Sequence, residues 1–201
     1  LVNPNNPTGR VVPAPTLLGW HQRLAARGGW LVVDEAFMDN SPANTVIKRA
    51  ECPGLIVLRS FGKFFGLAGV RLGFVAAEHS VLQRLAELLG PWTINGPSRV
   101  LAQASLTDLA TQQLQRQRCA GASERLAALL SHAGLAPAGG CDLFQYVRCE
   151  HAARLHDHLA RHGVLVRLFE QPAALRFGLP PSQADERRLA QALSAYRKDL
   201  T

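Results

Sequence analysis

One lysine of this chain lies in a setting that suits covalent chemistry. Lys63 belongs to the run SFGKFFGLAGVRLGF, with Ser60 three residues before it and Arg71 eight residues after it. A lysine amine can form a Schiff base with a carbonyl compound, and a hydroxyl together with a guanidinium can bind a phosphate ester. The run therefore predicts a lysine anchor beside a phosphate-binding group.

Two upstream segments carry other polar groups that a phosphorylated carbonyl cofactor would need. They are NPNNPTGR at residues 3–10 and VVDEAF at residues 32–37. The first supplies asparagines on a loop stiffened by prolines, and the second supplies two adjacent carboxylates. Together with the lysine run, they make pyridoxal 5'-phosphate the leading cofactor hypothesis.

The apolar pattern predicts buried strands that end at these polar segments. The strands are WLVVDEAF at residues 30–37, LIVLRSF at 55–61 and VRLGFVAA at 70–77. A helix with apolar residues at helical spacing precedes them and ends at Gly28, so helix and strand alternate and favour an α/β fold. Because ligands of such sheets bind at the carboxyl ends of strands, we expect Asp34, Ser60 and Lys63 to converge.

The segment GPWTINGPS at residues 90–98 interrupts this pattern with two Gly-Pro steps. We place a domain boundary there, with residues 1–95 as part of a large cofactor-binding domain. Residues 96–201 are expected to form an interdomain helix and a small C-terminal α+β domain. The spacing of leucine and alanine predicts one long helix over residues 99–131. Beyond it we expect strands at 142–149, 164–169 and 174–179 and helices at 151–163 and 182–198.

Composition narrows the classes of partner. The formal net charge is +7, but lysine and arginine are scattered singly, which argues against nucleic-acid binding. The four cysteines lack metal-finger spacing, so no metal site is expected. No apolar stretch approaches the roughly 20 residues that cross a bilayer, and no secretory signal is evident. We expect a cytoplasmic protein that acts on small molecules and does not bind membranes.

The chain begins Leu1-Val2-Asn3, without an initiator methionine and inside a segment interpreted as a functional loop. A natural domain rarely opens at its active site. We therefore expect these residues to be the C-terminal portion of a longer protein.

The three polar segments, in this order, resemble those of fold type I pyridoxal-phosphate enzymes of the aminotransferase class I and II family. The resemblance covers nearly the whole chain, and NPNNPTG, DEAF and SFGKFFGLAGVRLG are specific in combination although each is weak alone. It implies the C-terminal part of the large transferase domain, with a mostly parallel sheet, followed by a small α+β domain. It also implies a homodimer, because the family's active sites lie at a homodimer interface.

The resemblance implies a role for each motif residue. Lys63 is similar to the lysine that forms the Schiff base with the cofactor and then moves protons at the substrate Cα or at the cofactor's C4′. Asp34 resembles the carboxylate that pairs with the pyridine nitrogen, and Asn6 resembles the asparagine that hydrogen-bonds the ring oxygen. Ser60 and Arg71 resemble groups that bind the phosphate. Without the motif, these residues would be a surface lysine, a capping aspartate, an ordinary turn and a structural ion pair.

Three positions around these residues carry further expectations. Glu35 is expected to face away from the site and to be structural. Phe37 stands where many relatives have tyrosine, so a hydroxyl donor to the cofactor's ring oxygen is absent. Family members often have a cis Asn-Pro bond, for which Asn6–Pro7 is the candidate.

Two arginines of the C-terminal half resemble substrate-binding groups. Arg176 in LRFGLP resembles the arginine that binds the substrate α-carboxylate, and Arg167 in VLVR stands where phosphate-handling relatives use another cation. A phosphorylated amino acid has two anionic ends, which suits two arginines. The alternative is that both are solvated arginines at strand edges.

Within the family, the segments DEAF, GPWTIN, GCDLFQYV and LRFGLPP most resemble the threonine-phosphate decarboxylases of cobalamin biosynthesis, with histidinol-phosphate aminotransferases next. The first likeness implies decarboxylation of L-threonine O-3-phosphate to (R)-1-aminopropan-2-yl phosphate. The second implies amino transfer from histidinol phosphate or a similar amino acid. A third hypothesis is a non-catalytic interaction domain, because the family's ring-stacking aromatic and phosphate-binding helix start are absent from these residues.

Overall fold

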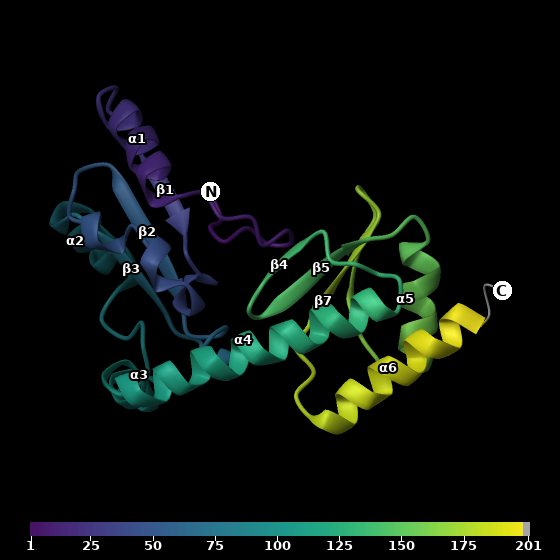
Figure 1. The fold of residues 1–201 in the computed structure, drawn as a ribbon. Helices are drawn as coiled ribbons and strands as arrows, with labels where there is room; N and C mark the ends of the chain where they lie inside the picture. Colours follow the sequence, from purple (N-terminus) through teal and green to yellow (C-terminus); the bar gives the residue numbers. More distant parts are fainter. Residues whose placement is uncertain (199–201) are drawn as a thin grey trace. The chain divides into compact units, whose positions relative to one another are not determined.

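In the computed structural model, which describes residues 1–198, the apolar runs beside the polar motifs form one sheet (Figure 1). Its strands are β1 (Leu31–Asp34), β2 (Leu55–Ser60) and β3 (Gly73–Ala77), in the order β1-β2-β3, and α2 (His79–Leu89) follows β3. β1 and β2 run parallel, whereas β2 and β3 run antiparallel. The predicted α/β fold is confirmed, and the sheet formed by these strands is mixed.

One face of this sheet packs against α1 (Ala14–Ala25), which begins beside Pro13. Side chains alternate between the two faces of a strand, and in β1 Leu31 and Val33 are buried while Val32 is 40% exposed. The buried core of this face consists of Leu17, Leu31, Val33, Val46, Ala50, Leu55 and Val57. A slip of one residue would turn these side chains to the other face, so the core fixes which way each strand end points.

Short 3-10 helices connect the strands of this sheet. They are η1 (Met38–Asn40), η2 (Pro42–Asn44) and η3 (Ile47–Arg49) between β1 and β2, and η4 (Ala68–Val70) between β2 and β3. The connections that follow the motif-bearing strand ends are therefore ordered turns rather than extended loops.

The prediction of one helix over residues 99–131 is wrong. The structure has two helices, α3 (Gly96–Thr107) and α4 (Leu109–His132), separated by Asp108. The ψ angle of Asp108 is 77°, outside the helical region, and its Oδ1 accepts a hydrogen bond from the Thr111 backbone N–H at 2.9 Å. Asp108 thus caps the start of α4, and its hydrogen bonds with Thr111 lower the pKa of its carboxyl.

The described chain divides into two units at a different place from the predicted domain boundary. The first unit comprises residues 1–6 and 10–115, and the second comprises residues 7–9 and the chain from residue 116 onward. α3 belongs to the first unit because Ala102 packs with Phe61 and Leu72, and because the Ser98 hydroxyl donates a hydrogen bond to the Val70 carbonyl at 2.8 Å. The division therefore falls within α4, and the predicted boundary after residue 95 stays a prediction about the whole protein.

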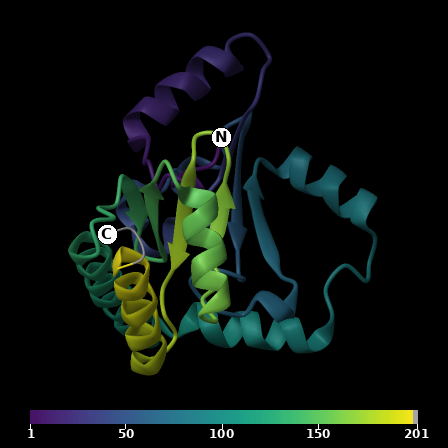
Figure 2. The ribbon, with the colours of Figure 1, turned by 90° about the vertical axis from the view of Figure 1, so that its right-hand side faces the viewer.

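The second unit holds an antiparallel sheet in the order β4-β5-β7-β6. Its strands are β4 (Gly139–Cys141), β5 (Phe144–Arg148), β6 (Arg167–Phe169) and β7 (Ala174–Gly178), and its helices besides the end of α4 are α5 (Ala152–Arg161) and α6 (Gln183–Lys198). Figure 2 shows α5 packed along one face of this sheet. The core of that face includes Leu130, Val147, Leu155, Leu175 and Leu193. Residues 199–201 of the predicted small domain lie outside the described residues.

A very close backbone approach joins the turn at residues 7–9 to β4. A Cβ atom added to Gly139 would lie 2.3 Å from the Thr8 carbonyl oxygen, and one added to Gly9 would lie 1.9 Å from the Gly140 carbonyl oxygen. Gly9 also has a φ of +69°, which favours glycine. Only glycines allow this contact between residues 7–9 and β4, both of which belong to the second unit.

The substitution Gly139→Ala is expected to destabilise the intact protein by about 1–3 kcal/mol, because the new methyl group meets a backbone atom that cannot move freely. Urea unfolding would measure the change. Gly178→Ala, in β7 of the same sheet, is the matched control, since a Cβ at Gly178 meets nothing within 4 Å. Equal unfolding midpoints for the two variants would contradict the close contact.

Candidate active site

Asp34 is the last residue of β1, and its side chain contacts the turn that follows the strand. Its Oδ1 accepts a hydrogen bond from the Ala36 backbone N–H at 2.9 Å. Its backbone N–H donates to the Leu1 carbonyl at 2.8 Å, and its carbonyl accepts from the Asn3 N–H at 2.8 Å, so Val2 forms a parallel bridge with Asp34. The NPNNPTGR segment therefore starts beside the strand end that carries Asp34.

Ser60 ends the neighbouring strand β2 and opens the lysine loop. Its hydroxyl oxygen accepts a hydrogen bond from the Gly62 N–H at 3.2 Å. Lys63 is exposed, and its Nζ lies 5.6 Å from the ring centroid of Phe37. Because Phe37 belongs to DEAF, the lysine loop and the DEAF segment meet at the carboxyl ends of two parallel strands.

Arg71 lies at the far end of the same loop. The loop is closed by a hydrogen bond from the Phe61 N–H to the Leu72 carbonyl at 3.1 Å, and Ser60 pairs with Gly73 across β2 and β3. Arg71 adopts φ 56° and ψ 47°, a left-handed conformation that is unfavourable for a residue with a Cβ. Its Nη1 donates to the Ala68 carbonyl at 3.1 Å. Strain of this kind clusters at functional sites and is consistent with the phosphate-binding prediction.

The NPNNPTGR segment corrects one expectation. The cis peptide bond is Asn3–Pro4, and the bond predicted to be cis, Asn6–Pro7, is trans. Asn6 lies exposed in the turn, whereas Asn3 is fully buried and its side-chain amide bonds both the N–H and the carbonyl of Val12, at 2.7 and 3.1 Å. Asn3 is thus the structural asparagine of the segment, which sequence reasoning did not single out.

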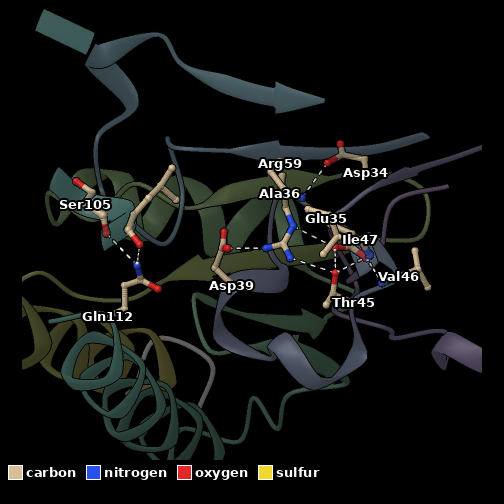
Figure 3. Close-up of polar contacts among 11 residues, drawn as sticks. Asp34, Glu35, Ala36, Asp39, Thr45, Val46, Ile47, Arg59, Ser105 and Gln112 are labelled. Carbon is tan, nitrogen blue, oxygen red and sulfur yellow. Dashed lines mark hydrogen bonds and ion pairs between the residues drawn. The ribbon is translucent and has the colours of Figure 1, made fainter. Parts of the chain in front are cut away.

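Glu35 is fully buried, and its carboxylate has other partners than that of Asp34. Its Oε1 accepts from the Val46 N–H at 2.8 Å, and its Oε2 lies 3.1 Å from Arg59 Nε (Figure 3). The expectation that Glu35 faces away from the site agrees with these contacts. Arg59, its partner, was not recognised from the sequence.

The two candidate substrate-binding arginines face each other in the second unit. Arg167 on β6 is the register partner of Arg176 on β7, and Tyr146 on β5 flanks Arg176 on the other side. They lie on the sheet face opposite Leu175, hence opposite the core. Burial lowers the pKa of the Arg176 guanidinium, and the nearby charge of Arg167 lowers it further. Two like charges at facing positions favour an anion between or above them.

Two other kinds of feature are absent from residues 1–198. No helix there has the length and hydropathy to cross a bilayer. No group of three or more histidine, cysteine, aspartate or glutamate side chains within those residues could hold a metal ion.

Comparison with known proteins identifies the family. Residues 1–193 match the model of the family described as aminotransferase class I and II. The chain belongs to this family. It is 57% identical over 198 residues to a threonine-phosphate decarboxylase from Pseudomonas aeruginosa. This match covers 98% of this chain and 60% of the relative. It is also 46% identical over 199 residues to a threonine-phosphate decarboxylase from a Sinorhizobium species, covering 96% of this chain and 58% of the relative.

A solved structure agrees with the family assignment. The crystal structure of histidinol-phosphate aminotransferase from Sinorhizobium meliloti in complex with pyridoxal-5'-phosphate has a TM-score of 0.91 and 26% sequence identity. The match covers 100% of this chain and 57% of that one. The chain thus spans less than two thirds of the length of these family members.

Proposed function

We propose that the whole protein is a pyridoxal-phosphate-dependent lyase that decarboxylates L-threonine O-3-phosphate to (R)-1-aminopropan-2-yl phosphate, for cobalamin biosynthesis. The observation that carries this proposal is the meeting of the lysine loop with DEAF, where Lys63 Nζ lies 5.6 Å from the Phe37 ring. The choice of reaction rests on the 57% identity to a threonine-phosphate decarboxylase. By the family resemblance we also expect a homodimer.

The residues at the strand ends fit a pyridoxal phosphate cofactor. Lys63 offers an exposed primary amine, and Asp34 offers a carboxylate at a strand end. Arg71 offers a guanidinium in a strained turn, two residues before Gly73, which pairs with Ser60 across the sheet. When bound, this cofactor accepts the electrons of a bond that breaks at the substrate Cα. Asn6 would hydrogen-bond the ring oxygen.

Each residue then has a defined task. The Asp34 carboxylate would keep a proton on the ring nitrogen, since a nearby negative charge favours a protonated base. The Lys63 amine would serve as the covalent anchor and then carry a proton to or from the reacting carbon. The Ser60 hydroxyl and the Arg71 guanidinium would bind the phosphate through charge-assisted hydrogen bonds.

The second unit would bind the substrate. Arg176 would bind the α-carboxylate, and Arg167 would bind the substrate phosphate. By fixing the direction of the carboxylate, the group that is lost as carbon dioxide, these arginines would favour decarboxylation over amino transfer.

The expected result for the intact protein is release of CO2 from L-threonine O-3-phosphate with pyridoxal 5'-phosphate alone, without 2-oxoglutarate. An independent measurement is the appearance of the amine product. Amino transfer to 2-oxoglutarate without CO2 release would instead support the alternative, an aminotransferase acting on histidinol phosphate or a similar amino acid. The likeness to the histidinol-phosphate aminotransferase fold keeps that alternative in view.

The third possibility is that these 201 residues act by themselves only as an interaction domain. The chain spans 60% of its decarboxylase relative, and we expect the piece alone to bind pyridoxal 5'-phosphate weakly or not at all. Titration with the cofactor tests this expectation. A tight, Lys63-dependent absorption band from the piece alone would contradict it.

A further inference from the structure

Figure 3 shows a polar cluster next to Asp34, formed by Glu35, Asp39, Thr45 and Arg59. At its centre is Glu35, which is 0% exposed. Its carboxylate accepts hydrogen bonds from the Val46 N–H at 2.8 Å and from the Thr45 hydroxyl, and it forms an ion pair with Arg59 at 3.1 Å. The carboxylate therefore has three separate partners that fix its orientation.

Arg59 joins this carboxylate to a second one. Its Nη1 donates to Asp39 Oδ1 at 2.5 Å, and its Nη2 donates to the Thr45 hydroxyl oxygen at 3.1 Å. The side chain of Arg59 is only 15% exposed and that of Asp39 only 17%. A planar guanidinium that binds several acceptors at once is held more rigidly than an ammonium would be.

The chain positions of this pair connect it to the site. Glu35 directly follows Asp34, and Arg59 directly precedes Ser60. Asp34 is in register with Leu58, and the Glu35 N–H donates to the Leu58 carbonyl at 2.9 Å, so the parallel ladder continues one residue beyond β1. Because side chains alternate, Glu35 and Arg59 share one face of the sheet while Asp34 and Ser60 share the other.

We propose that Glu35 and Arg59 are a positioning pair that sets the spacing between the Asp34 carboxylate and the Ser60 hydroxyl. The ion pair links the carboxyl ends of β1 and β2 on the face that packs against α1. Asp34 and Ser60, the two proposed cofactor-binding groups, project from the same strand ends on the opposite face. The bond to Asp39 extends the link into the segment that follows Phe37. This inference rests on the proposed function, in which Asp34 and Ser60 bind the cofactor.

Stability alone does not account for the pair. Two apolar side chains would continue the core of Leu31, Val33 and Val57 without removing two charges from water, and such replacements are often neutral or stabilising. An ion pair differs from an apolar contact in having direction, so it resists sliding and rotation of one strand end against the other. Loss of one partner would leave a buried charge and would disturb both strand ends.

The test uses the intact protein and titration with pyridoxal 5'-phosphate, followed by its Lys63-dependent absorption band. Glu35→Gln keeps an acceptor for the Val46 N–H but removes the ion pair, and Arg59→Met removes the guanidinium. Both are expected to raise the dissociation constant of the cofactor by about 10–100-fold, as for residues that orient a site's ligands from behind, and to shift the absorption band or its pH profile. Arg59→Lys should lose less cofactor affinity than Arg59→Met, because lysine keeps the positive charge although it lacks the planar set of N–H donors of the guanidinium.

The matched control is Arg84→Met, which breaks an ion pair with Glu87 on α2 whose side chains are 71% and 55% exposed. Its cofactor affinity should equal that of the unsubstituted protein. A lower urea midpoint with unchanged affinity and band in Glu35→Gln and Arg59→Lys would make the pair merely structural and overturn the inference, even if Arg59→Met does not fold. An unsubstituted protein without any Lys63-dependent band would overturn the proposed function itself.

Discussion

Replacing Lys63 by arginine is expected to lower the rate of CO2 release by at least about 10²–10⁴-fold, the contribution of a well-placed proton-transfer group. Arginine keeps the positive charge and nearly the same length. Its guanidinium stays protonated at all ordinary pH values, so it can neither react with a carbonyl group nor pass a proton to carbon. The measurement is kcat with saturating L-threonine O-3-phosphate in the intact protein.

The fold should survive this change, because Lys63 is exposed and its amine lies over the face of the Phe37 ring, which an arginine can also cover. Lys48→Arg, at an exposed position in η3, is the control and should leave kcat unchanged. If the Lys63 variant turned over substrate at the original rate, another group would have to supply the amine, and the central assignment would be wrong.

The strands and motifs were predictable because local signals agree with the tertiary structure. The apolar runs that end at Asp34 and Ser60 become adjacent parallel strands, since continuous apolar residues of strand length suit a sheet packed against a helix. The helix break at Asp108 was missed because leucine spacing continues across it. Aspartate is one of the preferred residues at the start of a helix, and Asp108, whose carboxylate accepts from the Thr111 N–H, is the signal that could have indicated the break.

The contacts around the site were less predictable because they depend on which faces meet. Nothing in the spacing of Glu35 and Arg59, which are separated by 23 intervening residues, distinguishes their pairing from that of other charged residues. The roles of the three asparagines in NPNNPTGR also depend on the turn geometry. The sheet register decides the pairing of Glu35 with Arg59, since these two residues extend the ladder that begins at Leu31 and Leu55.

The substitution Asp34→Asn is expected to lower kcat by about 10²–10³-fold, the cost of removing one preorganised charge-stabilising group. The carboxylate is assigned to hold a proton on the cofactor's ring nitrogen, and a neutral amide cannot stabilise that positive charge. The local structure should persist, because asparagine keeps a side-chain oxygen that can accept from the Ala36 N–H, now 2.9 Å from Asp34 Oδ1. Steady-state rates of CO2 release, with the folded fraction checked by circular dichroism, measure the effect.

A useful control is Asp157→Asn, which removes the same charge from a side chain that is 72% exposed on α5. It separates the local effect of Asp34 from a change in net charge. The effect at Asp34 should fall mainly on kcat, because the interaction gains strength only as electrons move toward the ring. A variant whose KM rises while kcat stays the same would mean that Asp34 serves binding alone, and one with neither change would remove Asp34 from the site.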